Sequence, residues 1–106
     1  MNNEELDIEI AVHVFGVSRE AIAAWPWGVP EFSTDRNYCS QVILRILVHD
    51  ARHIFDEKLE SAAMAWGWKS EPQYNGLGAA VLVLTPDEIC KAALAAIREC
   101  GSSKPI

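Results

Sequence analysis

The sequence has little positive charge. Nine of its 106 residues are Lys or Arg, against fifteen Asp and Glu, so the formal net charge is −6. The basic residues are scattered along the chain and form no cluster. Binding to a phosphate backbone needs grouped Lys and Arg side chains, so we do not expect direct nucleic-acid binding. The acidic balance is typical of a soluble protein and favours a partner that presents a basic surface.

Cysteine is also scarce. Cys39, Cys90 and Cys100 form no C-x-x-C pair, and an odd number of thiols cannot close a complete set of disulfides. We expect free, buried thiols in a reducing cytoplasm, and no cofactor. A nucleophilic pair such as Cys39 with His13 is conceivable. However, all three thiols lie on or beside apolar stripes, where cysteine is inert and its pKa is raised.

Long apolar runs are missing as well. The segment "VILRILV" is interrupted by Arg45 and is too short to span a bilayer. The first residues, "MNNEELDIEI", are acidic and do not resemble a signal peptide. We therefore expect a cytoplasmic protein without membrane contact.

Apolar residues, in contrast, make up half of the chain, and four of them are Trp. A chain of this length and composition can bury a core without disulfides or metal. We predict a single domain over residues 1–101, followed by a frayed tail over residues 102–106.

Capping signals predict helices in both halves of the chain. Asn2 with Glu5 favours a helix that ends near Gly16, although the alternation in "DIEIAVHV" would also suit a strand. Ser18 can cap a short second helix. The strongest signal is Thr85 followed by Pro86 and Glu88, which predicts a helix that ends before Gly101.

A further helix is expected to open at "FSTD". Ser33 or Thr34 can cap it, and Asp35 complements the helix dipole. A core-facing stripe follows, formed by Cys39, Val42, Ile43, Ile46 and Leu47. Leu44 and Val48 widen this stripe, so the helix should be covered on more than one side.

Residues 51–69 allow two interpretations. No Gly or Pro interrupts them before Gly67, so a helix is one option. Met64, Trp66 and Trp68 alternate with small residues, which favours a strand. We predict an antiparallel pair over residues 62–69 and 79–84, with 53–59 as a candidate third strand. The expected fold class is therefore α+β, a compact α-β-α sandwich with helices packed on a small antiparallel sheet.

Two of these helix starts, "PEFSTD" and "TPDEICKAALAAI", together with the short acidic helix "EELDIEIAVHVFG", are similar to those of the phage ABA sandwich family of bacteriophage and prophage proteins. The resemblance implies an α-β-α layered fold and a phage origin, and it supplies no catalytic residues. Small phage proteins of this size often act by binding a host protein, and by this analogy we expect a non-enzymatic inhibitor of a bacterial target, of which an immune effector such as a CRISPR surveillance complex is one example. The alternatives are a protein that sequesters a nucleotide signal by Trp stacking, with Arg19 or Lys69 as cationic groups, and a metal-dependent hydrolase.

Trp25 and Trp27 are the predicted anchors for a protein partner. They lie in "WPWGVPEF", a loop restrained by two prolines, and exposed Trp residues usually mark an interface. Trp66 and Trp68 are expected to fill the core instead. The acidic side chains Asp56, Glu57 and Glu60 are interpreted as a solvated face that could also contact a basic partner.

The segment "HDARH" is the candidate metal site. His49 and His53 stand one helical turn apart and have the spacing of the zinc-protease motif, with Asp50 in place of its Glu. A third ligand would have to be Asp56, Glu57 or a distant His13. Because a histidine near the end of a helix is also favoured by the helix dipole, we predict no metal at this position.

Overall fold

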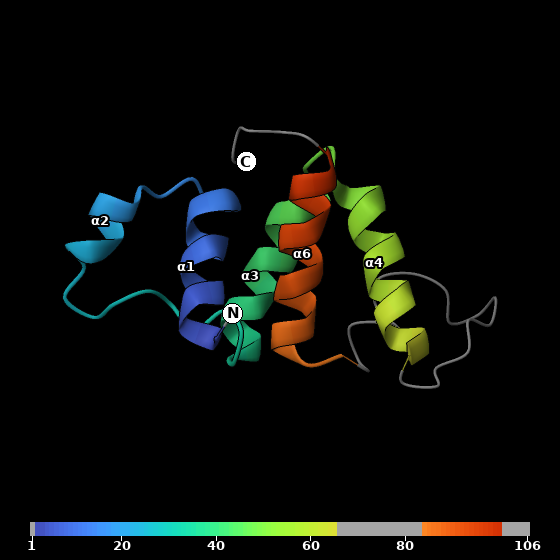
Figure 1. Ribbon diagram of the computed structural model, residues 1–106, viewed down its shortest axis with the longest axis horizontal. Helices are drawn as coiled ribbons and strands as arrows, with labels where there is room; N and C mark the ends of the chain where they lie inside the picture. The colour runs from blue at the N-terminus through green and yellow to red at the C-terminus, as the bar shows by residue number, and fades with distance from the viewer. Residues whose placement is uncertain (1, 66–83, 101–106) are drawn as a thin grey trace.

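The computed structural model describes residues 2–65 and 84–100, in which helices are joined by turns, bends and irregular segments. The helices are α1 (Asn3–His13), α2 (Arg19–Ala23), α3 (Arg36–Leu47), α4 (Arg52–Ala65) and α6 (Pro86–Cys100). Figure 1 shows α6 in the centre, with α1 on one side, α4 on the other, α3 behind and α2 outermost. Helix α6 packs against α1, α3 and α4, so it organises the core.

The sequence explains the central position of α6. Pro86 occupies its first position, and the Thr85 amide donates to the Glu88 carboxylate at 3.0 Å, as predicted for this helix start. Seven of its side chains are buried and they surround much of the helix: Ile89, Cys90, Ala92, Ala93, Leu94, Ala96 and Ile97. The small alanines let neighbouring helices approach closely. Lys58 of α4 also donates to Glu99 of α6 at 2.7 Å.

The first two helices begin at the predicted caps. The Asn2 side chain accepts from the Glu5 amide at 2.8 Å, and the Ser18 hydroxyl accepts from the Ala21 amide at 3.1 Å. The predicted cap of the next helix was wrong. Asp35 caps α3 by accepting from the Asn37 amide at 2.8 Å, while Ser33 is buried and interacts with α1.

The predicted fold class was wrong. Residues 2–65 and 84–100 contain no strand, so the α-β-α sandwich and its small antiparallel sheet are not found in the part of the chain that the structure describes. The candidate strand 53–59 lies inside α4, and residues 62–65 form the end of the same helix. Of the two remaining strand predictions, residues 66–69 and 79–83 lie outside the described ranges, and Leu84 belongs to the bend before α6.

Helical periodicity explains why α4 forms. Phe55, Leu59 and Ala63 are fully buried and stand four residues apart, so they line one face of a helix. Met64, by contrast, is largely exposed. The alternation that suggested a strand starts at Met64, at the end of this helix. The helical periodicity of apolar residues therefore extends over more residues of α4 than the two-residue alternation that suggested a strand.

Helix α3 buries only one face. Cys39, Val42 and Ile46 are buried, as the periodicity predicted. Leu44 and Val48 are 65% and 78% exposed, so the prediction that this helix is covered on more than one side was wrong. Within the described ranges, no helix combines the length and apolarity that a bilayer crossing would need.

Candidate functional site

The segment from Trp25 to Gly28 forms a tight turn directly after α2. The Gly28 amide donates to the Trp25 carbonyl at 3.3 Å, which closes a four-residue turn with Pro26 and Trp27 at its corners. No non-glycine residue in the described ranges has a positive φ, so this is a type I turn, in which proline suits the first corner and glycine the last position. Gly28 has φ +75°, a conformation that a side chain would strain.

This turn presents a tryptophan to solvent. Trp27 is 92% exposed and Trp25 is 36% exposed. The Trp25 amide donates to Ile22 of α2 at 3.1 Å, and Ile22 is itself buried, so the turn is attached to the core through this short helix. Trp27 therefore stands on a locally ordered backbone, and the structure distinguishes the two candidate anchors.

An acidic depression of about 340 Å³ begins at Gly28, the residue after Trp27. It lies where the N-terminal half of α1 meets the segment that leads to α3. Its lining contains three carboxylates and no basic side chain; the lining residues are Asn3, Glu4, Asp7, Gly28, Val29, Glu31 and Thr34. The surface beside the exposed tryptophan therefore has negative charge.

Asp7 forms the floor of this acidic depression and is 5% exposed. Its carboxylate accepts from the Ser33 amide at 2.8 Å, which joins α1 to the residues before α3. Burial raises the pKa of Asp7, and the bonds from Ser33 only partly offset this effect. The sequence predictions did not include this acidic depression. An available signal was the charged Asp7 between the apolar residues Leu6 and Ile8, but its partner is 26 residues away.

The acidic residues predicted to assist binding lie elsewhere. Asp56, Glu57 and Glu60 are exposed on α4. In Figure 1, α2 and the segment after it lie at one end of the row of helices, and α4 lies at the other. The structure therefore does not bring these carboxylates together with Trp25 and Trp27.

The "HDARH" segment spans the junction of two helices. His49 lies in the turn after α3, and His53 lies in the first turn of α4. The Ala51 amide donates to Nδ1 of His49 at 3.0 Å, so this nitrogen has a role in the turn. The two histidines do not share a helix, so the ligand pair that a zinc-protease motif requires is not formed.

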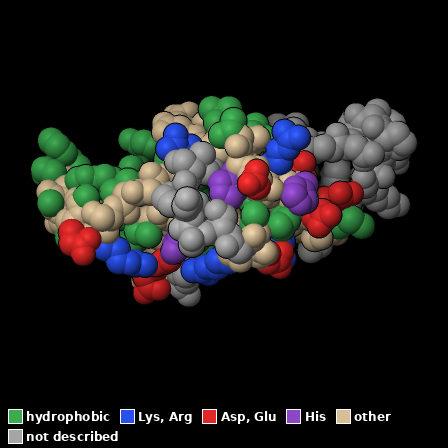
Figure 2. Space-filling model, turned by 90° about the horizontal axis from the view of Figure 1, so that it is seen from above, with side chains coloured by type: hydrophobic (Ala, Val, Ile, Leu, Met, Phe, Trp, Pro, Cys, Tyr) green, Lys and Arg blue, Asp and Glu red, His purple; other side chains and the backbone are tan. Residues whose placement is uncertain are grey.

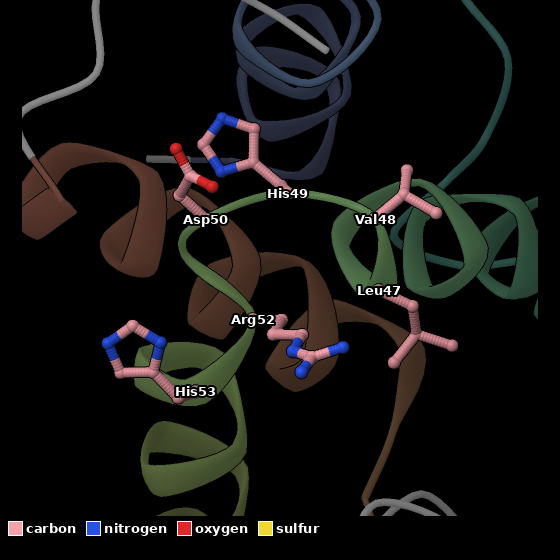
Figure 3. A pocket seen from close by; sticks show the side chains of 6 residues that line it. All are labelled: Leu47, Val48, His49, Asp50, Arg52 and His53. Carbon is pink, nitrogen blue, oxygen red and sulfur yellow. The ribbon is translucent and has the colours of Figure 1, made fainter.

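A depression of about 590 Å³ adjoins this turn, lined by Leu47, Val48, His49, Asp50, Arg52 and His53. In Figure 3 the two imidazoles and the Asp50 carboxylate lie on one side of the turn, while the Leu47, Val48 and Arg52 side chains lie on the other. Figure 2 looks down on this end of the molecule and shows histidine side chains beside acidic and basic ones. Within the described ranges, no three His, Cys, Asp or Glu residues are placed to share a metal ion.

Of the cationic groups considered for a nucleotide, Arg19 lies in the described part of the chain, where it is paired with a carboxylate of α1. The Arg19 guanidinium donates to Glu9 of α1, and this bond is the main reason why the pKa of Glu9 is lowered. His13 and Arg98 also approach Glu9, at 3.0 and 3.5 Å. Lys69, Trp66 and Trp68 lie outside the described residues.

The pair of Cys39 with His13, which the sequence analysis considered and did not favour as a nucleophile, is not assembled. His13 is paired with Glu9, while Cys39 lies against Pro86 of α6.

Comparisons with protein-family models, with curated proteins and with solved structures found no match to this chain. The assignment of a function therefore depends on the surface itself.

Proposed function

We propose that this chain is a non-catalytic protein-binding module that uses Trp27 as its anchor. The 92% exposure of this side chain on a closed turn carries the proposal. Tryptophan is enriched among the residues that dominate binding energy, because its burial in a partner removes a large apolar surface from water. Pro26 and the bond from Gly28 to Trp25 already order the backbone, so binding loses little further entropy there.

The charge beside Trp27 favours a basic partner. Glu4 and Glu31 are exposed at the acidic depression, and Asp7 lies below them. A Lys or Arg side chain of the partner would enter the acidic depression while its apolar neighbours cover the indole ring. Arg can also stack on tryptophan, which adds a cation–π contribution. The net charge of −6 steers such a partner towards the molecule.

The partner we propose is a bacterial host protein in the cytoplasm, which this chain inhibits by occupying a basic surface. A CRISPR surveillance complex is one example of such a target. The phage setting comes from the family resemblance alone, and the layered fold which that resemblance implied is contradicted in the described ranges. The binding role of Trp27 depends on its exposure and does not require the resemblance.

Affinity capture with matched baits tests this function. The wild-type chain, Trp27→Ala and Val48→Ala are immobilised and exposed to the same bacterial lysate. Val48 is a suitable control because it is an apolar side chain with 78% exposure that lies after α3, away from the turn. We expect one protein at near-stoichiometric yield on the wild-type and Val48→Ala baits, and its loss on Trp27→Ala. Thermal melts of all three baits check that they are folded.

Two results would contradict the proposal. The Trp27→Ala bait could retain the same protein at the same yield, which would place the interface elsewhere. A nucleotide released from the purified chain on denaturation, and identified by mass, would instead support the sequestering alternative.

A further inference from the structure

The outer face of α3 forms a stripe of uncharged side chains. Residues spaced three and four apart share one face of a helix, and the side chains at these positions of α3 and its C-cap are all exposed. Leu44, Leu47 and Val48 make the C-terminal half of this face apolar, while the N-terminal half carries amides and a hydroxyl. We call this face the α3 stripe, and its residues are Asn37, Ser40, Gln41, Leu44, Leu47 and Val48.

Positive charge flanks the α3 stripe, although the chain as a whole is acidic. Arg36 and Arg45 stand nine residues apart in α3, or about two and a half turns, so they lie on opposite edges of the stripe. The Arg36 guanidinium donates to the Leu84 carbonyl at 2.8 Å, and the Arg45 guanidinium lies 5.5 Å from the centre of the Phe15 ring. These contacts fix the positions of both groups. Among the helices of the described ranges, α3 alone contains no Asp or Glu.

A third arginine stands at the C-terminal end of the α3 stripe. Arg52 is exposed at the start of α4. In Figure 3 its side chain lies on the same side of the turn as those of Leu47 and Val48, while the Asp50 carboxylate lies on the other side. These side chains also line the depression of about 590 Å³ at this turn. This end of the stripe therefore offers space for an incoming side chain, with apolar walls and a cation beside them.

We propose that the α3 stripe binds an acidic amphipathic helix of a protein partner. Such a helix would place apolar side chains on Leu44, Leu47 and Val48 and its carboxylates beside the flanking arginines. The apolar contact removes surface from water, and the arginine–carboxylate bonds set the orientation of the partner helix. Helix α3 has 12 residues and is about 18 Å long, so it can contact a partner helix over three turns.

This surface is independent of the tryptophan turn and would exist whether or not Trp27 binds a protein. The two surfaces also respond to different substitutions. A protein held by the α3 stripe would be retained by Trp27→Ala and lost with Val48→Ala, which is the opposite of what an anchor at Trp27 requires.

The charge around the α3 stripe argues against two other occupants. A second copy of this chain would present the same patch on both sides of the contact, which would bring Arg36, Arg45 and Arg52 of both copies together. An anionic lipid surface would repel a chain of net charge −6, and the amides of Asn37 and Gln41 would lose their hydrogen bonds to water in an acyl layer. A protein helix can supply carboxylates to the arginines and bond the amides as well.

Peptide binding to the full-length protein tests the proposal. The probe is a fluorescent helical peptide of roughly 15 residues, with leucines on one face and glutamates on both sides of that face. A matched peptide has lysine in place of glutamate. Leu44→Gln removes an apolar group from the stripe without adding charge. Met64→Gln is the control, because Met64 is an exposed apolar residue of α4 that lies outside the stripe. Thermal melts check that both variants are folded.

Fluorescence anisotropy measures the affinity of each pair. We expect the glutamate peptide to bind wild type and Met64→Gln equally, and to bind Leu44→Gln about tenfold more weakly. Arg52→Gln should weaken binding at low salt and lose this effect as salt is added. The lysine peptide should bind wild type and Leu44→Gln equally, because the acidic chain attracts it at other positions.

The proposal would be overturned if the glutamate peptide did not bind, or bound Leu44→Gln as tightly as wild type. Two further measurements would overturn it by identifying another occupant. Co-sedimentation of wild type, but not of Leu44→Gln, with phosphatidylglycerol vesicles would assign the α3 stripe to a lipid surface. Dimerisation of wild type, but not of Leu44→Gln, in analytical ultracentrifugation would assign it to a second copy of this chain.

Discussion

Asp7 shows how one carboxylate can link stability and the proposed binding surface. It is nearly buried, and its bond to the Ser33 amide holds α1 against the segment that leads to α3. An ionised carboxylate in this position loses hydration, which explains its raised pKa. The same group adds negative charge to the acidic depression when it ionises. Its protonation state therefore affects both the fold and the surface offered to a basic partner.

The first prediction concerns Asp7→Asn. The folded-state pKa of Asp7 is raised above its ordinary value of 3.8, so the folded chain binds this proton more tightly than the unfolded chain does. The contribution of Asp7 to the free energy of unfolding is present below pH 3.8 and is lost as the pH rises through the folded-state pKa. Asn keeps an acceptor for Ser33 but cannot ionise. The stability of Asp7→Asn relative to wild type should increase across this pH interval.

Urea denaturation at pH values below, within and above the interval measures this difference. Glu31→Gln is the control, because Glu31 is an exposed residue of the same acidic depression. If the difference in the free energy of unfolding between Asp7→Asn and wild type does not change with pH, the assignment of a raised pKa to Asp7 is contradicted.

At the scale of helices, local signals predicted the starts better than the tertiary arrangement. Asn2, Ser18 and Thr85 each mark a helix start that the structure confirms, because a cap involves residues only a few positions apart. Helix α4 was mispredicted because its decisive partner, α6, lies about thirty residues further along the chain. Burial of Phe55 and Leu59 against the core selects the helix, and no short pattern shows that contact.

The candidate site shows the same contrast between local sequence signals, which could be predicted, and tertiary contacts, which could not. Pro26 and Gly28 flank Trp27, so the turn and its exposed ring could be predicted from four consecutive residues. The acidic depression needs Asp7 beside Ser33, and this pairing depends on how α1 packs. Spacing alone also suggested a metal pair at His49 and His53, where the structure places the junction of two helices.

The second prediction tests whether residues near 61 are helical in solution. Ser61 is exposed on α4, so its replacement changes intrinsic propensity with little change in packing. In a helix, alanine is more favourable than valine by about 0.5 kcal/mol. In a strand the order reverses, because β-branched residues are preferred there. Ser61→Ala should therefore unfold at a higher denaturant concentration than Ser61→Val, and the opposite order would contradict a helix at this position.

The third prediction concerns α6, the helix that contacts three others. Ile89→Ala and Ile97→Ala remove buried side chains and should each lower the free energy of unfolding by about 2–5 kcal/mol. Thr85→Ala should lower the free energy of unfolding by about 0.5–2 kcal/mol, because the hydrogen bond from the Thr85 hydroxyl to the Glu88 carboxylate at the helix start is lost. Lys91→Ala, at an exposed position, should stay within about 0.5 kcal/mol of wild type. If Ile89→Ala and Lys91→Ala were equally stable in chemical denaturation, α6 would not be the centre of the core.

For the whole molecule, the main feature is the separation of two acidic surfaces. The acidic depression lies beside Trp27, and the exposed carboxylates Asp56, Glu57 and Glu60 lie on α4 at the far end of the row of helices. A partner anchored on Trp27 would contact the first surface directly. The second surface could act on such a partner only through its long-range field, because salt screens charges beyond about 10 Å at 0.1 M. The two surfaces should therefore affect different steps of binding.

The fourth prediction uses this separation, with the partner captured by the wild-type chain. Reversal of charge at Asp56, Glu57 and Glu60 to Lys should slow association at low salt, leave dissociation unchanged and lose its effect as salt is added. Glu31→Gln, at the acidic depression, should speed dissociation and keep part of its effect at high salt, because its contact with a basic side chain would be shielded from solvent.

Trp27→Ala should weaken binding by about 1–4 kcal/mol by increasing the dissociation rate, with an unchanged melting temperature. Association and dissociation rates over a salt series separate these effects. If the α4 reversal speeds dissociation and Glu31→Gln does not, the partner contacts α4 and the anchor must be sought there.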